Sequence, residues 1–116
     1  MQRQKLAMRV ESAGGWDAIK RDCLSLAKQH TEGFHSTWRD TNLPPAIIAL
    51  KPLLVQYDPA FRCINMRIFG IHSTGGHSTP FLGLEVVTEQ SPAYKPGAGY
   101  HHSAFREVAE GIYELY

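Results

Sequence analysis

Cysteine is scarce in this chain, which has only Cys23 and Cys63 among its 116 residues. Two cysteines cannot build the disulfide framework of a small secreted protein, and these two form neither a CxxC pair nor a zinc-finger spacing. An excess of one charge is also missing, since 12 Lys and Arg oppose 11 Asp and Glu for a formal net charge of +1. This balance excludes the strongly basic composition of a general nucleic-acid binder, although it leaves room for a local basic patch.

Long apolar runs are missing too, and no stretch approaches the roughly 18–20 residues that a membrane-spanning helix needs. The first residues, MQRQKLAMRV, lack the continuous apolar core of a secretory signal. The composition is that of an ordinary globular protein, 43% hydrophobic and 20% charged, at a length typical of one domain. We therefore expect a single globular domain over residues 1–116, soluble and cytoplasmic, with no membrane contact.

The N-terminal quarter of the chain has the apolar spacing of helices. Leu6, Val10 and Ala13 recur at steps of four and three, which predicts a helix that ends before the glycine at 14. The alternation of residues 6, 8 and 10 leaves a strand as the alternative for this segment. A second helix is predicted from about 16 to 31, and Cys23 lies on its apolar stripe, so we interpret Cys23 as a core residue rather than a nucleophile.

The next segment is broken by prolines. Residues 34–43 are interpreted as irregular, and a short helix is predicted over about 44–50, with Thr41 or Asn42 as its cap. Pro52 disfavours helical geometry and removes an amide donor, so a strand over about 53–57 is expected to follow. A kinked helix that runs through Pro52 is the alternative for this segment.

Two segments, RCINMRIFGI and FLGLEVVTE, alternate apolar and polar residues, which predicts two strands that each bury one side. In the second strand Glu85 and Glu89 fall on the side opposite the apolar residues. In the first strand Cys63 falls opposite Ile64, which predicts an exposed thiol.

An apolar stripe at helical spacing ends the chain and predicts a helix over about 103–116. Gly111 weakens this helix by about 1 kcal/mol relative to alanine. The predicted fold class is α+β, a small antiparallel β-sheet of about three strands packed against N- and C-terminal helices. Such a sheet leaves open edges, which an antiparallel homodimer would cover.

The loop HSTGGHST, residues 72–79, is the chemically richest segment of the sequence. Its adjacent glycines allow consecutive amides to face an anion, and an imidazole in the loop suits acid or base catalysis near neutral pH. A plain polar linker between two strands has the same composition, and we favour that interpretation. The candidate ligand-binding residues are His72, Ser73, Thr74, Gly75, Gly76 and His77.

Metal ligands and nucleophiles lack a recognisable spacing. A zinc site would need the histidines at 72, 77, 101 and 102 to converge, with Glu85 or Glu89 as an oxygen ligand. No HExxH, HxH or paired-cysteine spacing supports such a site, and no GxSxG motif marks a nucleophilic serine. We therefore assign no metal, no cofactor and no catalytic residue, and we favour a protein that is not an enzyme.

Aromatic residues in irregular segments suggest a contact surface instead. Two tyrosines flank KPGAG in a long loop, and rigid rings bury much area at low entropic cost. We expect the loops 72–80 and 91–102 to contact another protein, which makes the chain a small binding or regulatory protein such as an inhibitor, accessory subunit or adaptor. The predicted anchors are Arg67, Tyr94, Tyr100 and His101.

Two alternatives to this function stay open. One is a small enzyme, or an anion- or metal-binding protein, that uses the loop from His72 to Thr79. The other is a nucleic-acid-binding protein that uses the basic N-terminal arm with Arg39, Arg62 and Arg67.

Overall fold

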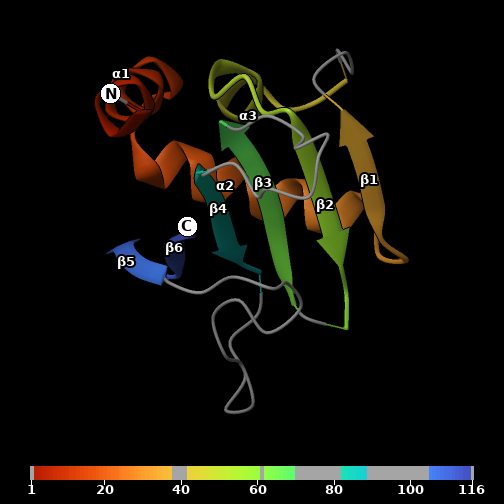
Figure 1. The fold of residues 1–116 in the computed structure, drawn as a ribbon. Helices are drawn as coiled ribbons and strands as arrows, with labels where there is room; N and C mark the ends of the chain where they lie inside the picture. The colour runs from red at the N-terminus through yellow and green to blue at the C-terminus, as the bar shows by residue number, and fades with distance from the viewer. Residues whose placement is uncertain (1, 38–41, 61, 70–81, 89–104, 116) are drawn as a thin grey trace, which may run out of the picture.

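The computed structural model describes residues 2–37, 42–60, 62–69, 82–88 and 105–115, which form a layer of helices packed on an antiparallel sheet (Figure 1). The described sheet has six strands in the order β1-β2-β3-β4-β6-β5, and every neighbouring pair is antiparallel. The elements along the chain are α1 (Gln2–Ala13), α2 (Trp16–Gln29), β1 (Phe34–Thr37), α3 (Pro45–Ala49), β2 (Leu54–Asp58), β3 (Cys63–Phe69), β4 (Leu82–Val87), β5 (Phe105–Ala109) and β6 (Ile112–Leu115).

This strand count corrects the predicted fold class. The chain is α+β as expected, but the sheet has six strands rather than about three, and the three described helices all precede β2. The helix predicted over 103–116 is wrong, because β5 and β6 occupy residues 105–109 and 112–115. The segment 34–37, interpreted as irregular, is part of the sheet as its edge strand β1.

The C-terminal segment forms a hairpin because its sequence also satisfies the pairing of two strands. Arg106 pairs with Glu114 and Glu107 with Tyr113, on either side of a turn at residues 110–111. Gly111 in that turn has φ +74. Glycine adopts this left-handed conformation without strain, so the residue that would weaken a helix here closes a hairpin.

The other predicted helices and strands are confirmed with small shifts of their ends. The prediction that the strands near 62–71 and 81–89 each bury one side is wrong, because both faces of β4 and most of both faces of β3 are buried. The N-terminal segment is a helix rather than a strand, and Gly14 follows its end at φ +100. The predicted second helix, the short helix before Pro52 and the three strands near 53–57, 62–71 and 81–89 all appear in the structure. Among the described residues, no helix combines the length and the apolar character that crossing a membrane requires.

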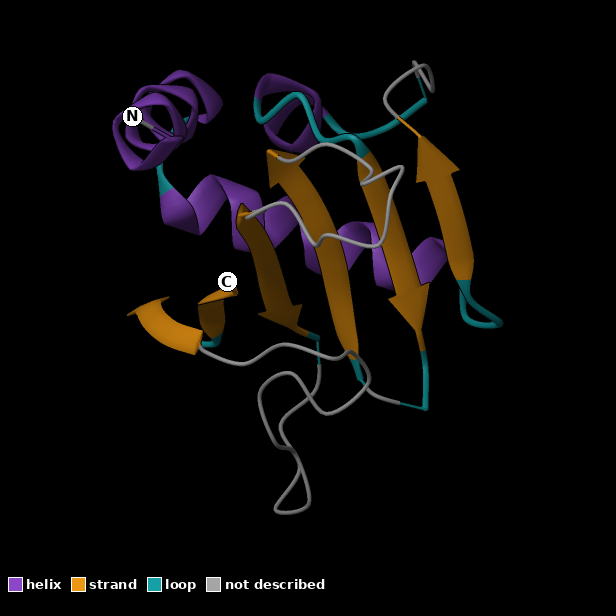
Figure 2. Cartoon of the chain, viewed as in Figure 1, coloured by secondary structure: helices purple, strands orange, loops and turns teal. Residues whose placement is uncertain are grey.

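The hydrophobic core lies between the helices and one face of the sheet. α2 passes behind the central strands, whereas α1 and α3 lie beside the upper end of the sheet (Figure 1, Figure 2). Alternate residues of the central strands point into this core, and α2 contributes its predicted apolar stripe, including Cys23. The most deeply buried side chains of the core are Ile19, Cys23, Leu26, Ile47, Leu50, Val55, Ile64, Met66, Ile68, Leu84, Val86 and Ile112.

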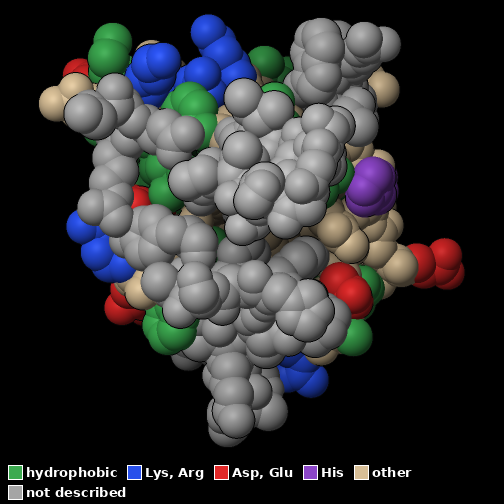
Figure 3. Space-filling view, viewed as in Figure 1, with side chains coloured by type: hydrophobic (Ala, Val, Ile, Leu, Met, Phe, Trp, Pro, Cys, Tyr) green, Lys and Arg blue, Asp and Glu red, His purple; other side chains and the backbone are tan. Residues whose placement is uncertain are grey.

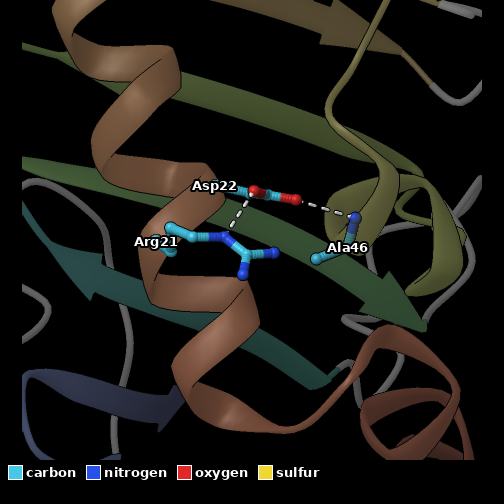
Figure 4. Close-up of polar contacts among 3 residues, drawn as sticks. All are labelled: Arg21, Asp22 and Ala46. Atoms are coloured by element: carbon cyan, nitrogen blue, oxygen red, sulfur yellow. Dashed lines mark hydrogen bonds and ion pairs between the residues drawn. The ribbon is translucent and has the colours of Figure 1, made fainter.

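Asp22 joins α2 to α3 (Figure 4). Its Oδ2 accepts a hydrogen bond from the Ala46 amide at 2.9 Å, and its Oδ1 accepts one from Arg21 Nε at 3.3 Å. The first turn of α3 has Pro44 at its N-cap position without a side-chain cap, so the carboxylate of Asp22 supplies the acceptor from 24 residues away. The structure thus places Pro44 rather than Asn42 at the N-cap position, and Thr41 lies outside the described residues.

Replacing Gly111 with alanine distinguishes the hairpin from the predicted helix, because the two structures predict opposite changes in the free energy of unfolding. In a helix the change would stabilise the protein by about 1 kcal/mol. In the left-handed conformation of this turn, an alanine side chain instead costs about 1–2 kcal/mol. We expect Gly111→Ala to lower the free energy of unfolding in a urea titration, and Gly111→Asn to lower it less, because asparagine tolerates that conformation. An alanine variant more stable than the parent would contradict the hairpin.

Candidate functional site

The two faces of the sheet differ in their chemistry. Side chains alternate between the faces along a strand, and residues paired across neighbouring strands share a face. The face opposite the helical core, here called the polar face, carries one row with a polar side chain on every strand. We call it the polar row, and from β1 to β5 it consists of His35, Gln56, Asn65, Glu85, Tyr113 and Glu107.

Glu85 lies in the middle of the polar row and is 1% exposed. Its Oε1 accepts a hydrogen bond from Asn65 Nδ2 at 3.3 Å and another from the thiol of Cys63 at 3.4 Å. A buried carboxylate is unfavourable unless hydrogen-bond donors satisfy it, so both neighbours help to hold Glu85 on this face. We call Cys63, Asn65 and Glu85 the Glu85 cluster.

The thiol of Cys63 is a hydrogen-bond donor rather than a nucleophile. Burial raises its pKa, and the charge of Glu85 and the hydrogen bond to that carboxylate raise it further. A protonated thiol is a poor nucleophile at neutral pH. The prediction that Cys63 is exposed is wrong, since the residue is 2% exposed on the polar face. Cys23 is fully buried in the core, which confirms its interpretation.

At the β5 end, the polar row meets a large exposed ring. Phe105 is 54% exposed, and its ring meets that of Tyr113 edge-on, with 6.0 Å between the centroids and 77° between the planes. Tyr113 is half-buried, and its pKa is raised by burial first and then by the charge and hydrogen bond of Glu107. In the described sheet β5 is an edge strand, so Phe105 stands at the border of the polar face.

Arg106 fixes the same strand from the core side of the sheet. Its Nη2 lies 3.1 Å from Oε2 of Glu114, whose side chain is 4% exposed, whereas that of Arg106 is 55% exposed. The cation thus satisfies a buried carboxylate with one edge of its guanidinium group and presents the remainder to solvent.

Only one of the sequence-predicted site residues lies in the described part of the chain. Arg67 is half-buried on β3, and its cross-strand row continues through Gly83 and Leu115 to Phe105. Arg67 and Phe105 therefore share the polar face, three strand spacings or about 14 Å apart. The remaining predicted ligand-binding and contact residues fall outside the described residues: His72, Ser73, Thr74, Gly75, Gly76, His77, Tyr94, Tyr100 and His101.

On the face seen in Figure 3, the basic side chains of the described residues do not gather into one patch. Arg9 is used structurally, since its Nη1 donates to the Leu50 carbonyl at 3.1 Å and its guanidinium carbon lies 4.3 Å from the centroid of the Phe69 ring. On the face seen in Figure 3, the Lys and Arg side chains of the described residues stand in separate groups around the rim, with acidic side chains between them. Among the described residues, no group of three or more His, Cys, Asp or Glu is placed to hold a metal ion.

Sequence reasoning missed Phe105 as a contact residue. It placed Glu85 on the side of a strand opposite the apolar residues and named it as a possible oxygen ligand of a metal, but it did not predict the burial of Glu85. The available signals were the alternation of FREV before a Glu-Gly turn and a single charge inside the apolar run LGLEVV. Neither signal reports how deeply a face is buried or which strand lies at the edge. Comparison with protein-family models, curated proteins and solved structures finds no match to the chain.

High pH is expected to weaken the fold through the Glu85 cluster. Because the pKa of Cys63 is raised above its ordinary value of 9.0, the thiol stays protonated in the folded protein but ionises in the unfolded chain. The resulting stability is complete below about pH 9 and is lost as the pH rises further, by up to about 1.4 kcal/mol per pH unit for each thiol. We expect Cys63→Ala to reduce the slope of unfolding free energy between about pH 9 and 10.5, measured by urea titration.

Ser25→Ala is the control for this measurement, since Ser25 is exposed on α2 and its replacement should leave the slope unchanged. A Cys63→Ala variant with the slope of the parent would show that the thiol ionises equally in both states.

Proposed function

We propose that this chain is a small binding or regulatory protein that acts through contact with another protein, centred on β5. The observation that carries the proposal is Phe105, a large aromatic side chain that is 54% exposed on an edge strand. Aromatic and arginine side chains are enriched at the centres of protein interfaces, because they bury a large area in one contact. Phe105 supplies an aromatic side chain, and its neighbour Arg106 supplies an arginine.

The fixed positions of both side chains support this function. The Phe105 ring rests edge-on against Tyr113, and Arg106 is paired with the buried carboxylate of Glu114. Side chains that are already held in one conformation lose less entropy when a partner binds, so they contribute more to affinity than freely rotating ones.

Arg67 and the tyrosine-containing loop belong to the same proposal. Arg67 shares the polar face with Phe105, about 14 Å away. The anchors Tyr94, Tyr100 and His101 stay predictions from the sequence. Both cysteines are free, which suits a reducing compartment, so the cytoplasm is the proposed location.

Removal of the Phe105 ring tests the proposal. We expect Phe105→Ala to keep the thermal midpoint within a few degrees of the parent, because the ring is more than half exposed. The same variant should capture its partner at least about tenfold more weakly from an extract of the cells that carry the protein, as expected for an interface anchor. Quantitative mass spectrometry of the captured proteins makes the measurement.

Met8→Ala is the matched control, because Met8 is also a large apolar residue, 69% exposed on α1. The proposal is wrong if the parent and Phe105→Ala capture the same proteins in the same amounts, or if Met8→Ala loses them equally.

A further inference from the structure

We infer that the outer edge of β5 binds an extended segment of the partner protein as an added antiparallel strand, with a basic residue opposite Glu107 and an apolar residue opposite Phe105. This inference rests on the proposed function and names the kind of segment that the surface would take. Within the described sheet β5 pairs with β6 on one side only. Its other side therefore offers the backbone donors and acceptors to which an extended peptide adds in strand addition.

The side chains at this edge define what the added strand must carry. Glu107 is exposed on the polar face, where Phe105 also lies, and Arg106 is exposed on the opposite face. Residues directly opposite each other in antiparallel strands share a face, and unlike charges stabilise such a pair. Read from its own N-terminus, an antiparallel partner strand would thus carry a basic residue opposite Glu107. An acidic residue opposite Arg106 and an apolar residue opposite Phe105 would follow.

A second copy of this chain fits the edge poorly. Within the regular stretch 105–107, two β5 strands related by a twofold axis with matched faces can overlap by three residues in only one register. That register sets Arg106 opposite Arg106 of the other copy and Phe105 opposite Glu107. Like charges directly opposite each other are destabilising, so a heterologous strand is the better occupant.

The regular part of the edge is short. The register of β5 against β6 shifts between Glu107 and Ala109, a bulge that twists the end of the strand. The contact is therefore concentrated on residues 105–107, and side-chain complementarity at these three positions decides which segment binds.

Two synthetic peptides test the charge pattern, Ac-TVKEVT-NH2 and the swapped Ac-TVEKVT-NH2, each titrated into the full chain with binding followed by amide NMR shifts at low salt. We expect the first peptide to bind about tenfold more tightly, because both charge pairs are attractive with it and repulsive with the other. Glu107→Lys should reduce this preference at least about threefold. Glu110→Lys, which makes the same charge change at the exposed turn, should leave the preference intact.

Methylated backbones test the added strand itself. Alternate amides of an added strand face the sheet, so of two peptides N-methylated at adjacent residues one should lose binding and the other should retain it. Equal binding of both methylated peptides, equal binding of the two charge patterns, or no binding of either peptide at millimolar concentration would overturn the inference. Concentration-dependent dimerisation that Phe105→Ala or Glu107→Lys abolishes would overturn it in favour of a second copy.

These outcomes are separable from those of the proposed function. If Phe105→Ala abolishes partner capture while the peptides show no charge preference, the proposed contact with another protein is supported. The inference that the partner adds a strand to β5 is then wrong. If Phe105→Ala leaves partner capture unchanged as well, both the proposed function and the strand-addition inference are wrong.

Discussion

The packing of α2 across one face of the sheet is the constraint on which the rest of the structure depends. Residues of a strand alternate between its faces, so the side chains that α2 buries decide which side chains stand on the polar face. With Ile64 and Leu84 directed into the core, Asn65 and Glu85 must lie opposite. A slip of β4 by one residue would move the Glu85 carboxylate into the apolar layer, and the cost of that burial helps to fix the register.

The sequence predicts a helix or a strand correctly where the spacing of its apolar residues fits only one of the two structures. The stripe of α2 and the alternation of β3 and β4 are long enough to have a single interpretation as helix or strand. The structure confirms the helix and both strands, although both faces of β4 are buried. The same alternation says nothing about what covers a strand face. Cys63 is correctly placed opposite Ile64, yet it is buried, because both faces of β3 are shielded at that point. Burial of the Glu85 cluster was therefore out of reach of any local pattern.

The C-terminal segment shows how two periods can compete within one stretch of chain. Its apolar residues satisfy helical spacing, but Ile112 also pairs with Val86 of β4, and the Val87 amide donates to the Gly111 carbonyl at 2.8 Å. These contacts are made by residues more than 20 positions apart, so helix or strand is decided by the neighbouring strand rather than by the segment itself. This segment contains two of the three strands that the predicted sheet lacks, and the third is β1.

The same competition explains why the candidate contact at β5 escaped sequence reasoning. On a helix stripe Phe105 would be a core residue, whereas at the start of an edge strand it is left at the border of the polar face. Its position is nevertheless tied to the core, because Lys20 Nζ of α2 donates to the Glu110 carbonyl in the turn at 2.8 Å. The helix that fixes the register of the central strands thus also holds the hairpin that carries Phe105. In the proposed contact, an exposed ring on a strand held in this way would act as a pre-positioned anchor, which distinguishes it from the exposed Met8 on α1.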